Sequence, residues 1–281
     1  MNSNELRIRA VSAISEIAAQ AWDACANPGG RADPASPPSP FNPFVSYAFL
    51  SALEQSRSAT ARTGWQPQHL VVESADGSIA GVVPCYLKSH SRGEYVFDHG
   101  WAEAYERAGG RYYPKLQVSV PFTPVTGRRL LARPGPAEPS AQGALLAALA
   151  ELARLRDASS VHMTFLTERE WRLAAGRGFL QRTDQQFHWE NNGYATFDDF
   201  LAALSARKRK TIRRERREAT EPGIDIAWLT GTDLTEGVWD AFFAFYMDTG
   251  SRKWGSPYLT RAFFSLVGQS MADDILLVVA K

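Results

Sequence analysis

Cysteine and long apolar runs are scarce in this sequence. Its 281 residues include only two cysteines, Cys25 and Cys85, and neither belongs to a Cys-x-x-Cys pair. Two cysteines cannot build the disulfide framework of a small secreted domain, and the N-terminus lacks the apolar core and cleavage site of a secretory signal. No stretch approaches the ~20 apolar residues that a membrane-spanning helix requires. We therefore expect a reduced, cytoplasmic protein without a membrane span.

The common sequence signatures of catalysis are also missing. The sequence contains no Gly-x-Ser-x-Gly nucleophile elbow, no Walker-type phosphate loop and no His-Glu-x-x-His zinc motif. Its five histidines do not have the spacing of metal ligands, so we expect no bound metal. Cys25 has no histidine placed to activate it and is interpreted as a small apolar filler. No residue can be assigned as catalytic from motifs.

Charge is balanced over the whole chain but not locally. Lysine and arginine total 31 against 30 aspartates and glutamates, a net charge of +1. Residues 207–217 (RKRKTIRRERR) contain eight basic residues and one acid, a local +7, which leaves −6 for the remainder. A solvated helical face usually mixes the two signs, so we favour contact with RNA or phosphate groups over a merely solvated face. The residues expected to bind anions are Arg207, Lys208, Lys210, Arg213, Arg214 and Arg217.

Alternating helix and strand patterns predict an α/β fold. Helices are expected at residues 44–56, 141–156, 197–218, 236–248 and 261–270. Strands are expected at residues 69–73, 79–87, 95–97, 116–120, 161–165, 187–189, 224–229 and 275–280. Ser140 and Thr196 fit the N-cap position of two helices, and Pro84 indicates an edge or a bulge in its strand. Helices and strands mix in the same way in both halves, which suggests two copies of one α/β unit.

This pattern divides the chain into four parts. They are an N-terminal segment with a Pro-rich loop (1–40), a first domain (41–195), a basic connecting helix (196–222) and the start of a second domain (223–281). The sequence ends on an apolar strand, and a second domain of roughly 60 residues would bury too little surface to be stable alone. We therefore expect the second domain to be incomplete.

The loop expected at residues 98–115 concentrates aromatic and charged side chains between two strands. Its candidates for substrate binding are Asp98, Trp101, Tyr113 and Lys115, because such groupings at strand ends are typical of a ligand cleft. For the aromatic rings we favour the alternative of core packing, whereas for Asp98 and Lys115 both interpretations stay open. If this is a site, Asp98 and Lys115 should lie at the mouth of one cleft.

A second group of candidates follows the helix expected at residues 236–248. Arg252, Lys253, Trp254 and Tyr258 lie on the Gly-containing loop after that helix. Arg252 and Lys253 could bind a substrate phosphate or carboxylate. The alternative, slightly less favoured, is a loop stabilised by local salt bridges.

Three separated segments together resemble one family. FDHGWAEAYERAGGRYYPKL with VPFTPVTGRRLL, then RKRKTIRRERR, then FYMDTGSRKWGSPYLTRAFF are similar to the FemAB-like proteins. These are bacterial relatives of the Fem peptidoglycan aminoacyltransferases, within the GNAT acyltransferase superfamily. The resemblance extends from about Phe41 to the end and implies tandem GNAT-like domains with mixed, mostly antiparallel sheets flanked by helices.

The resemblance also implies an N-acyltransferase reaction, with no tightly bound cofactor. The acyl donor would be acyl-coenzyme A or aminoacyl-tRNA, and the acceptor an amine of a small molecule or peptidoglycan precursor. From residue type and loop position, Asp98 would contact the acceptor amine, and Lys115 a phosphate or carboxylate. Residues 132–139 (ARPGPAEP) occupy the place of the coenzyme A pyrophosphate turn, where three prolines remove N–H donors.

Two expectations follow from the prolines at the place of the coenzyme A turn. The first domain should bind coenzyme A poorly, and the donor turn of the second domain would lie beyond Lys281, so this chain alone should be inactive. The rival interpretation is a non-catalytic module that binds RNA or a cell-wall precursor through the basic helix.

Overall fold

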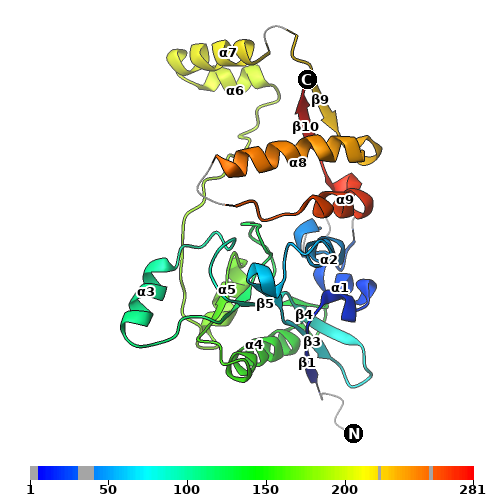
Figure 1. The fold of residues 1–281 in the computed structure, drawn as a ribbon, viewed down its shortest axis with the longest axis vertical. Coiled ribbons are helices and arrows are strands. Elements are labelled where there is room, and N and C mark those ends of the chain that lie inside the picture. The colour runs from blue at the N-terminus through cyan, green and yellow to red at the C-terminus, as the bar shows by residue number, and fades with distance from the viewer. Residues whose placement is uncertain (1–5, 31–40, 221–222, 253–255) are drawn as a thin grey trace.

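The computed structural model describes residues 6–30, 41–220, 223–252 and 256–281, which form a mixed α/β structure (Figure 1). One sheet has the order β1 (Arg7–Val11), β3 (His69–Glu73), β4 (Ile79–Val83), β7 (Leu131–Ala132). A second sheet has the order β2 (Trp65–Pro67), β5 (Cys85–Lys88), β6 (Lys115–Val118), β8 (Val161–Met163), and a third pairs β9 (Ile226–Leu229) with β10 (Leu277–Ala280). All neighbours in these sheets are antiparallel except β6 and β8. The expected mixed, mostly antiparallel sheets flanked by helices are confirmed.

Pro84 is the point at which the chain passes from one sheet to the other. The single strand expected at residues 79–87 is two strands, β4 and β5, with Pro84 between them. Proline lacks an N–H for a continuous ladder, so the chain changes partners there. Residues 69–88 therefore connect the two sheets.

Helices cover both faces of the sheets. The helix α4 (Glu138–Leu155) packs its buried leucines and alanines against one face of β3, β4 and β6. The helices α1 (Ala19–Ala26) and α2 (Tyr47–Gln55) contribute to the core on the opposite face. Since β1 pairs with β3 and α1 packs against β4, residues 6–30 are part of the first folded unit.

Several predicted elements differ from the structure. Residues 95–97 and 187–189 are not strands, and the expected loop contains the helix α3 (His99–Arg107). Tyr95 has φ +56°, which interrupts an extended strand. The helix α4 begins at Glu138 with Ala137 as N-cap, so Ser140 lies inside it. The sequence prediction missed β1, α1, β2, β7 and α5 (Glu168–Ala175).

The predictions for the last 85 residues are closer to the structure. The elements found are α6 (Phe197–Ala203), α7 (Ala206–Thr220), β9 (Ile226–Leu229), α8 (Glu236–Ser251), α9 (Arg261–Ser270) and β10 (Leu277–Ala280). Thr196 caps α6 in a reciprocal capping box with Asp199, as predicted. The single helix expected at 197–218 is broken, because Leu204 adopts an extended conformation between α6 and α7.

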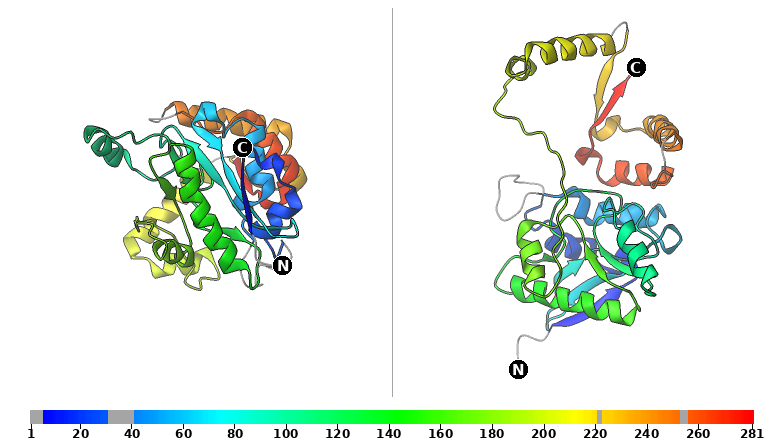
Figure 2. Two further views of the ribbon diagram at one scale, coloured as in Figure 1. Left: turned by 90° about the horizontal axis from the view of Figure 1, so that it is seen from below. Right: turned by 90° about the vertical axis from the view of Figure 1, so that its left-hand side faces the viewer.

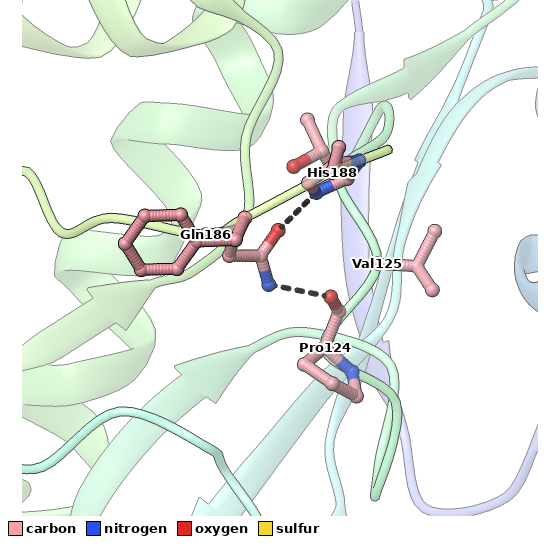
Figure 3. Close-up of a pocket in the computed structure, with 6 residues that line it drawn as sticks. Pro124, Val125, Gln186 and His188 are labelled. Carbon is pink, nitrogen blue, oxygen red and sulfur yellow. Dashed lines mark hydrogen bonds between the residues drawn. The ribbon is translucent and has the colours of Figure 1, made fainter. Parts of the chain in front are cut away.

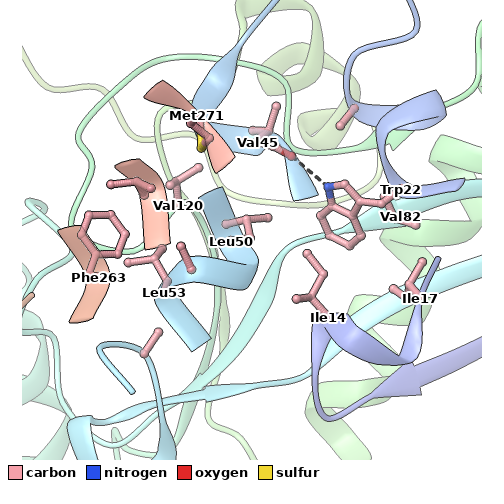
Figure 4. Close-up of a cluster of buried hydrophobic side chains, with 14 of the residues drawn as sticks. Ile14, Ile17, Trp22, Val45, Leu50, Leu53, Val82, Val120, Phe263 and Met271 are labelled. Atoms are coloured by element: carbon pink, nitrogen blue, oxygen red, sulfur yellow. Dashed lines mark hydrogen bonds between the residues drawn. The ribbon is translucent and has the colours of Figure 1, made fainter. Parts of the chain in front are cut away.

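We call residues 223–252 and 256–281 the second unit, and the helix α9 joins it to the first. Phe263 and Met271 lie beside Leu50 and Leu53 of α2 in one continuous hydrophobic core (Figure 4). The Thr260 hydroxyl donates to the Ser56 carbonyl at 2.9 Å, at the start of the same contact. By contrast, α6 and α7 lie at the end of the molecule remote from α4 (Figure 2, right). No helix in the described part of the chain combines the length and the apolar character needed to cross a membrane.

We predict that the shared core makes both units unfold together. Phe263 is buried and its ring meets that of Phe49 at 5.7 Å, so Phe263→Ala should lower the free energy of unfolding by about 3–5 kcal/mol. Chemical denaturation should show one transition at a lower midpoint. Phe245→Ala, on the exposed side of α8, is the control and should change stability by less than about 0.5 kcal/mol. Two transitions, of which only one shifts, would contradict the prediction.

Candidate functional site

One face of the sheet β2-β5-β6-β8 is polar although it is buried. Lys88 lies opposite Lys115, and Tyr86 lies opposite Gln117, in the antiparallel pair of β5 and β6. Directly opposite residues share a face, so these four side chains project to the same side. The intervening residues, such as Leu116, pack on the other side with α4. A buried sheet face that carries two lysines requires partners for their charges.

Those partners come from the loop and helix that follow β5. Lys115 Nζ donates hydrogen bonds to Ser91 Oγ and Glu94 Oε2 at 2.8 Å each, and to Asp98 Oδ2 at 2.5 Å. The Tyr112 hydroxyl donates to the same oxygen of Asp98 at 2.7 Å. We call this group the lysine cluster; its members are Lys88, Ser91, Glu94, Asp98, Tyr112 and Lys115.

Lys88 has a different environment from Lys115. Its Nζ lies 3.5 Å from the centre of the Trp65 ring and 3.8 Å from Glu94 Oε1. Its one hydrogen bond in the described structure is a long one, 3.4 Å to the Arg92 carbonyl. The ring face attracts an ammonium, but it leaves the amine short of hydrogen-bond acceptors. Lys88 is therefore the less firmly bound of the two lysines.

Burial and pairing shift the pKa values of the cluster in opposite directions. Burial lowers the pKa of Lys88 to about 7, despite the opposing charge of Glu94. Burial raises the pKa of Glu94, and the charge of Lys115 only partly offsets this. Burial also acts to raise the pKa of Asp98, but hydrogen bonds with Lys115 and Ser91 outweigh it and lower the value to about 2. Asp98 is thus ionised near neutral pH, whereas Lys88 is close to its titration midpoint.

Unsatisfied polar atoms collect around this cluster. Among the described residues, seven buried side-chain nitrogen or oxygen atoms have no hydrogen-bond partner, and five belong to this face and its loop. The five are Tyr86 Oη, Glu94 Oε1, Asp98 Oδ1, Gln117 Oε1 and Ser119 Oγ. Three of them can accept hydrogen bonds but not donate them: the amide oxygen of Gln117, and the oxygens of Glu94 and Asp98 when these carboxyl groups are ionised. Such a concentration is suited to a ligand that donates N–H groups.

The loop that carries Glu94 is in contact with the second unit through the ring of Phe122. Gly93, in the loop that carries Glu94, has φ +80°, and an added Cβ would lie 2.6 Å from the Phe122 ring. The Phe122 ring in turn stacks on Tyr258 at 4.9 Å. Tyr258 thereby contacts the wall of the site, at a distance of more than 130 residues along the chain from Phe122.

Asp98 and Lys115 come together as predicted, but their setting differs from the prediction. Both side chains are fully buried, so they do not lie at the mouth of a cleft. Lys115 has three N–H donors and all three are used within the cluster, so none is left for the expected phosphate or carboxylate of a substrate. Tyr113 joins the cluster through its hydroxyl, 2.7 Å from Ser91 Oγ. Trp101 is 56% exposed on α3, and core packing is therefore the wrong interpretation for this ring.

The other predicted residues lie outside the cluster. Arg252 pairs with Asp248 one turn earlier on α8, which matches the alternative of a local salt bridge. Lys253 and Trp254 lie outside the described residues. A shallow pocket between Pro124–Thr126 and Gln186–His188 is bridged by Gln186, which donates to the Pro124 carbonyl at 2.9 Å (Figure 3). Its polar groups bind one another, so it offers little for a ligand.

The basic residues predicted to bind anions all lie on α7, which has no buried residue. Arg213 is 3.3 Å from Asp198, and Arg214 is 3.6 Å from Glu218. Arg207, Lys208 and Lys210 form no ion pair with any described residue. Half of the predicted set thus presents uncompensated charge on an exposed helix.

Sequence reasoning missed Lys88, Glu94 and Tyr112. Lys88 and Tyr86 alternate with apolar residues along β5, as Lys115 and Gln117 do along β6. That matching alternation was a usable signal for a polar sheet face. Glu94 had no such signal, because its position follows from the contact with Lys115.

The chain is similar to known proteins as follows. The FemAB-like family model, described as peptidoglycan biosynthesis/recognition, matches residues 13–281. A crystal structure of a Trypanosoma brucei acetyltransferase matches with a TM-score of 0.36 and 14% identity, over 66% of this chain and 99% of that chain. Comparison with curated proteins gives no match.

We predict a pH dependence of stability that Lys88 causes. The folded state holds Lys88 at a pKa of about 7, whereas the unfolded chain keeps a value of about 10.4. From about pH 7 to about pH 10 the unfolded state binds a proton that the folded state lacks, so stability rises with pH, by up to about 1.4 kcal/mol per unit.

Lys88→Met removes this contribution. The free energy of unfolding of the wild type, relative to Lys88→Met, should increase between about pH 7 and pH 9. Denaturant titrations at several pH values measure it. Lys208→Met, on the exposed surface of α7, is the matched control and should show no such change. A wild-type advantage that is constant or falls with pH would exclude the low pKa.

Proposed function

Because the chain belongs to the FemAB-like family of peptidoglycan biosynthesis and recognition, we propose that it is an N-acyltransferase acting on an amine of a peptidoglycan precursor. The observation that supports this most directly is the pair of carboxylate oxygens without a hydrogen bond, Glu94 Oε1 and Asp98 Oδ1, in the lysine cluster; the former has only the ion pair with Lys88 at 3.8 Å. Two buried acceptor oxygens, on carboxylates that share Lys115 as a partner, favour a ligand with several N–H groups, as an amine or ammonium has.

The proposed reaction forms one bond and breaks one. The acceptor amine nitrogen attacks the carbonyl carbon of the acyl donor, a thioester or an ester, and forms an amide bond. The bond from that carbon to the donor sulfur or oxygen breaks. The amine loses a proton, and the departing thiol or hydroxyl group gains one, so the reaction needs no other reactant.

Each member of the cluster has a role in this proposal. Asp98 and Glu94 orient the amine, and Lys115 positions both carboxylates through its hydrogen bonds. Lys88, with a pKa of about 7, is present in part as the neutral amine and can accept the proton that the nucleophile loses.

The donor is proposed to be acyl-coenzyme A or aminoacyl-tRNA. The turn between β7 and α4 contains Pro134 and Pro136, and Pro139 lies in the first turn of α4. These residues supply no N–H to a pyrophosphate. This supports aminoacyl-tRNA over coenzyme A for any donor contact at this turn.

Acyl transfer to a muramyl-peptide amine tests the proposal, with acetyl-coenzyme A and aminoacyl-tRNA offered as donors. Asp98→Asn and Lys88→Met should each lower kcat/KM by roughly 10²-fold or more. The wild-type rate should rise with pH through about 7, and Lys88→Met should lose that rise.

Asp76→Asn is the matched control, because Asp76 lies in an exposed turn where asparagine keeps the same acceptor oxygen. Thermal melting checks that each variant is folded. Folded Asp98→Asn and Lys88→Met variants with wild-type kcat/KM, or no transfer from either donor, would contradict the proposal. Transfer by this chain would in turn overturn the expectation that it is inactive alone.

A second candidate function is supported by α7. Its exposed, uncompensated charge fits a non-catalytic module that binds RNA through the phosphate backbone. Arg207, Lys208 and Lys210 changed together to glutamine should weaken binding of a tRNA, and lower the slope of log affinity against log salt by about 2.

The control is the triple change of Arg154, Arg169 and Arg172 to glutamine, exposed arginines on α4 and α5 whose loss alters net charge equally. Equal loss of affinity in both triple variants would show that only net charge matters and would exclude a binding role specific to α7.

A further inference from the structure

Three large aromatic rings are exposed directly beside the lysine cluster. Phe97, Trp101 and Tyr105 are 74%, 56% and 48% exposed, and we call them the aromatic platform. Trp101 and Tyr105 are four residues apart, so they lie on one side of α3, and Phe97 directly precedes the N-cap of the helix. Arg182 connects two of them, because it lies over the Trp101 ring at 5.0 Å and donates to the Phe97 carbonyl at 3.0 Å.

Packing inside the protein covers only part of these rings: Tyr105 contacts Tyr112, and Arg182 lies over Trp101. Ala102 is the one buried residue of α3. The helix is instead anchored at its two ends, at the start by Asp98 in the cluster and near its end by the contact of Tyr105 with Tyr112. An aromatic surface that is held in place and is still about half exposed or more is typical of a binding surface.

The charge of this region narrows the class of ligand. The charged side chains of α3, of the turn after it and of the residues that contact them are Glu103, Glu106 and Asp157 against Arg107, Arg111 and Arg182, which sum to zero. A membrane or nucleic-acid surface is polyanionic and would favour excess positive charge, as α7 has. A neutral surface with flat aromatic rings and hydrogen-bonding side chains at its rim fits a sugar ring, whose C–H face is apolar and whose edge carries hydroxyl groups.

We propose that the aromatic platform binds the glycan part of the acceptor, an N-acetylated amino sugar. The proposal deepens the proposed function and rests on it for the choice of a peptidoglycan-type sugar. Asp98 belongs to both regions: its backbone begins α3, and its carboxylate lies in the cluster. A sugar on the platform would therefore place its attached peptide beside the groups proposed to orient the amine.

Calorimetric titration with uncharged N-acetylglucosamine tetrasaccharide, without any acyl donor, tests the proposal. We expect saturable binding that changes little with salt, and an affinity about 10-fold lower for Trp101→Ala. Tyr105→Phe should keep the affinity, and Tyr105→Ala should lose it. Trp228→Ala is the matched control, since Trp228 is 66% exposed on β9, and its affinity should equal that of the wild type.

Three outcomes would overturn the proposal. They are no saturable binding by the wild type, equal affinity of wild type and Trp101→Ala, and Trp101-dependent binding to anionic phospholipid vesicles or tRNA in place of the sugar. Transfer assays separate this inference from the proposed function. If the platform binds sugar, Trp101→Ala should raise KM for a glycan-bearing acceptor at unchanged kcat, and should leave transfer to a free peptide unaffected. Sugar binding without any acyl transfer would refute the proposed function alone.

Discussion

The ammonium group of Lys115 is the centre on which the surrounding structure depends. It bonds to Ser91, Glu94 and Asp98, and all three of these residues are buried. Each buried charge is tolerated only because the others are present. The loop from Ser91 to Asp98 forms no helix or strand ladder, so these bonds define its course. Since α3 begins at the next residue, the position of the aromatic platform follows from the same interaction.

The fold could be predicted best where one signal was strong and local. The helices α4, α8 and α9 have clear apolar faces, and the capping box at Thr196 depends only on residues near it. Errors arose where a tertiary contact decided the conformation. Residues 79–87 have continuous β-type composition, yet Pro84 separates two strands whose partners lie elsewhere in the chain. The positive φ of Tyr95 comes directly after Glu94, which the hydrogen bond from Lys115 holds in place.

The site could be predicted in part, for a related reason. Asp98 and Lys115 were recognised because aromatic and charged residues crowd one segment. Their burial could not be predicted, since it depends on Tyr112, Glu94 and the contact of Phe122 with Gly93. Polar side chains in a loop are ordinarily solvated, and only the folded arrangement shows that these lie beneath the loop. The role of Lys88 arises from the Trp65 ring above it, and that residue comes from another strand.

The isolation of α7 has a consequence for its own conformation. A helix of 15 residues without a buried side chain has little more support than a peptide in water, where such lengths are marginal. Arg209 and Arg213, like Lys210 and Arg214, are four residues apart and repel one another across successive turns. Neutralising these charges removes the repulsion, so a polyanion that contacts α7 would also increase its helix content. The helix content of α7 then depends on the ions around it, while the core formed by α2 and α9 stays unchanged.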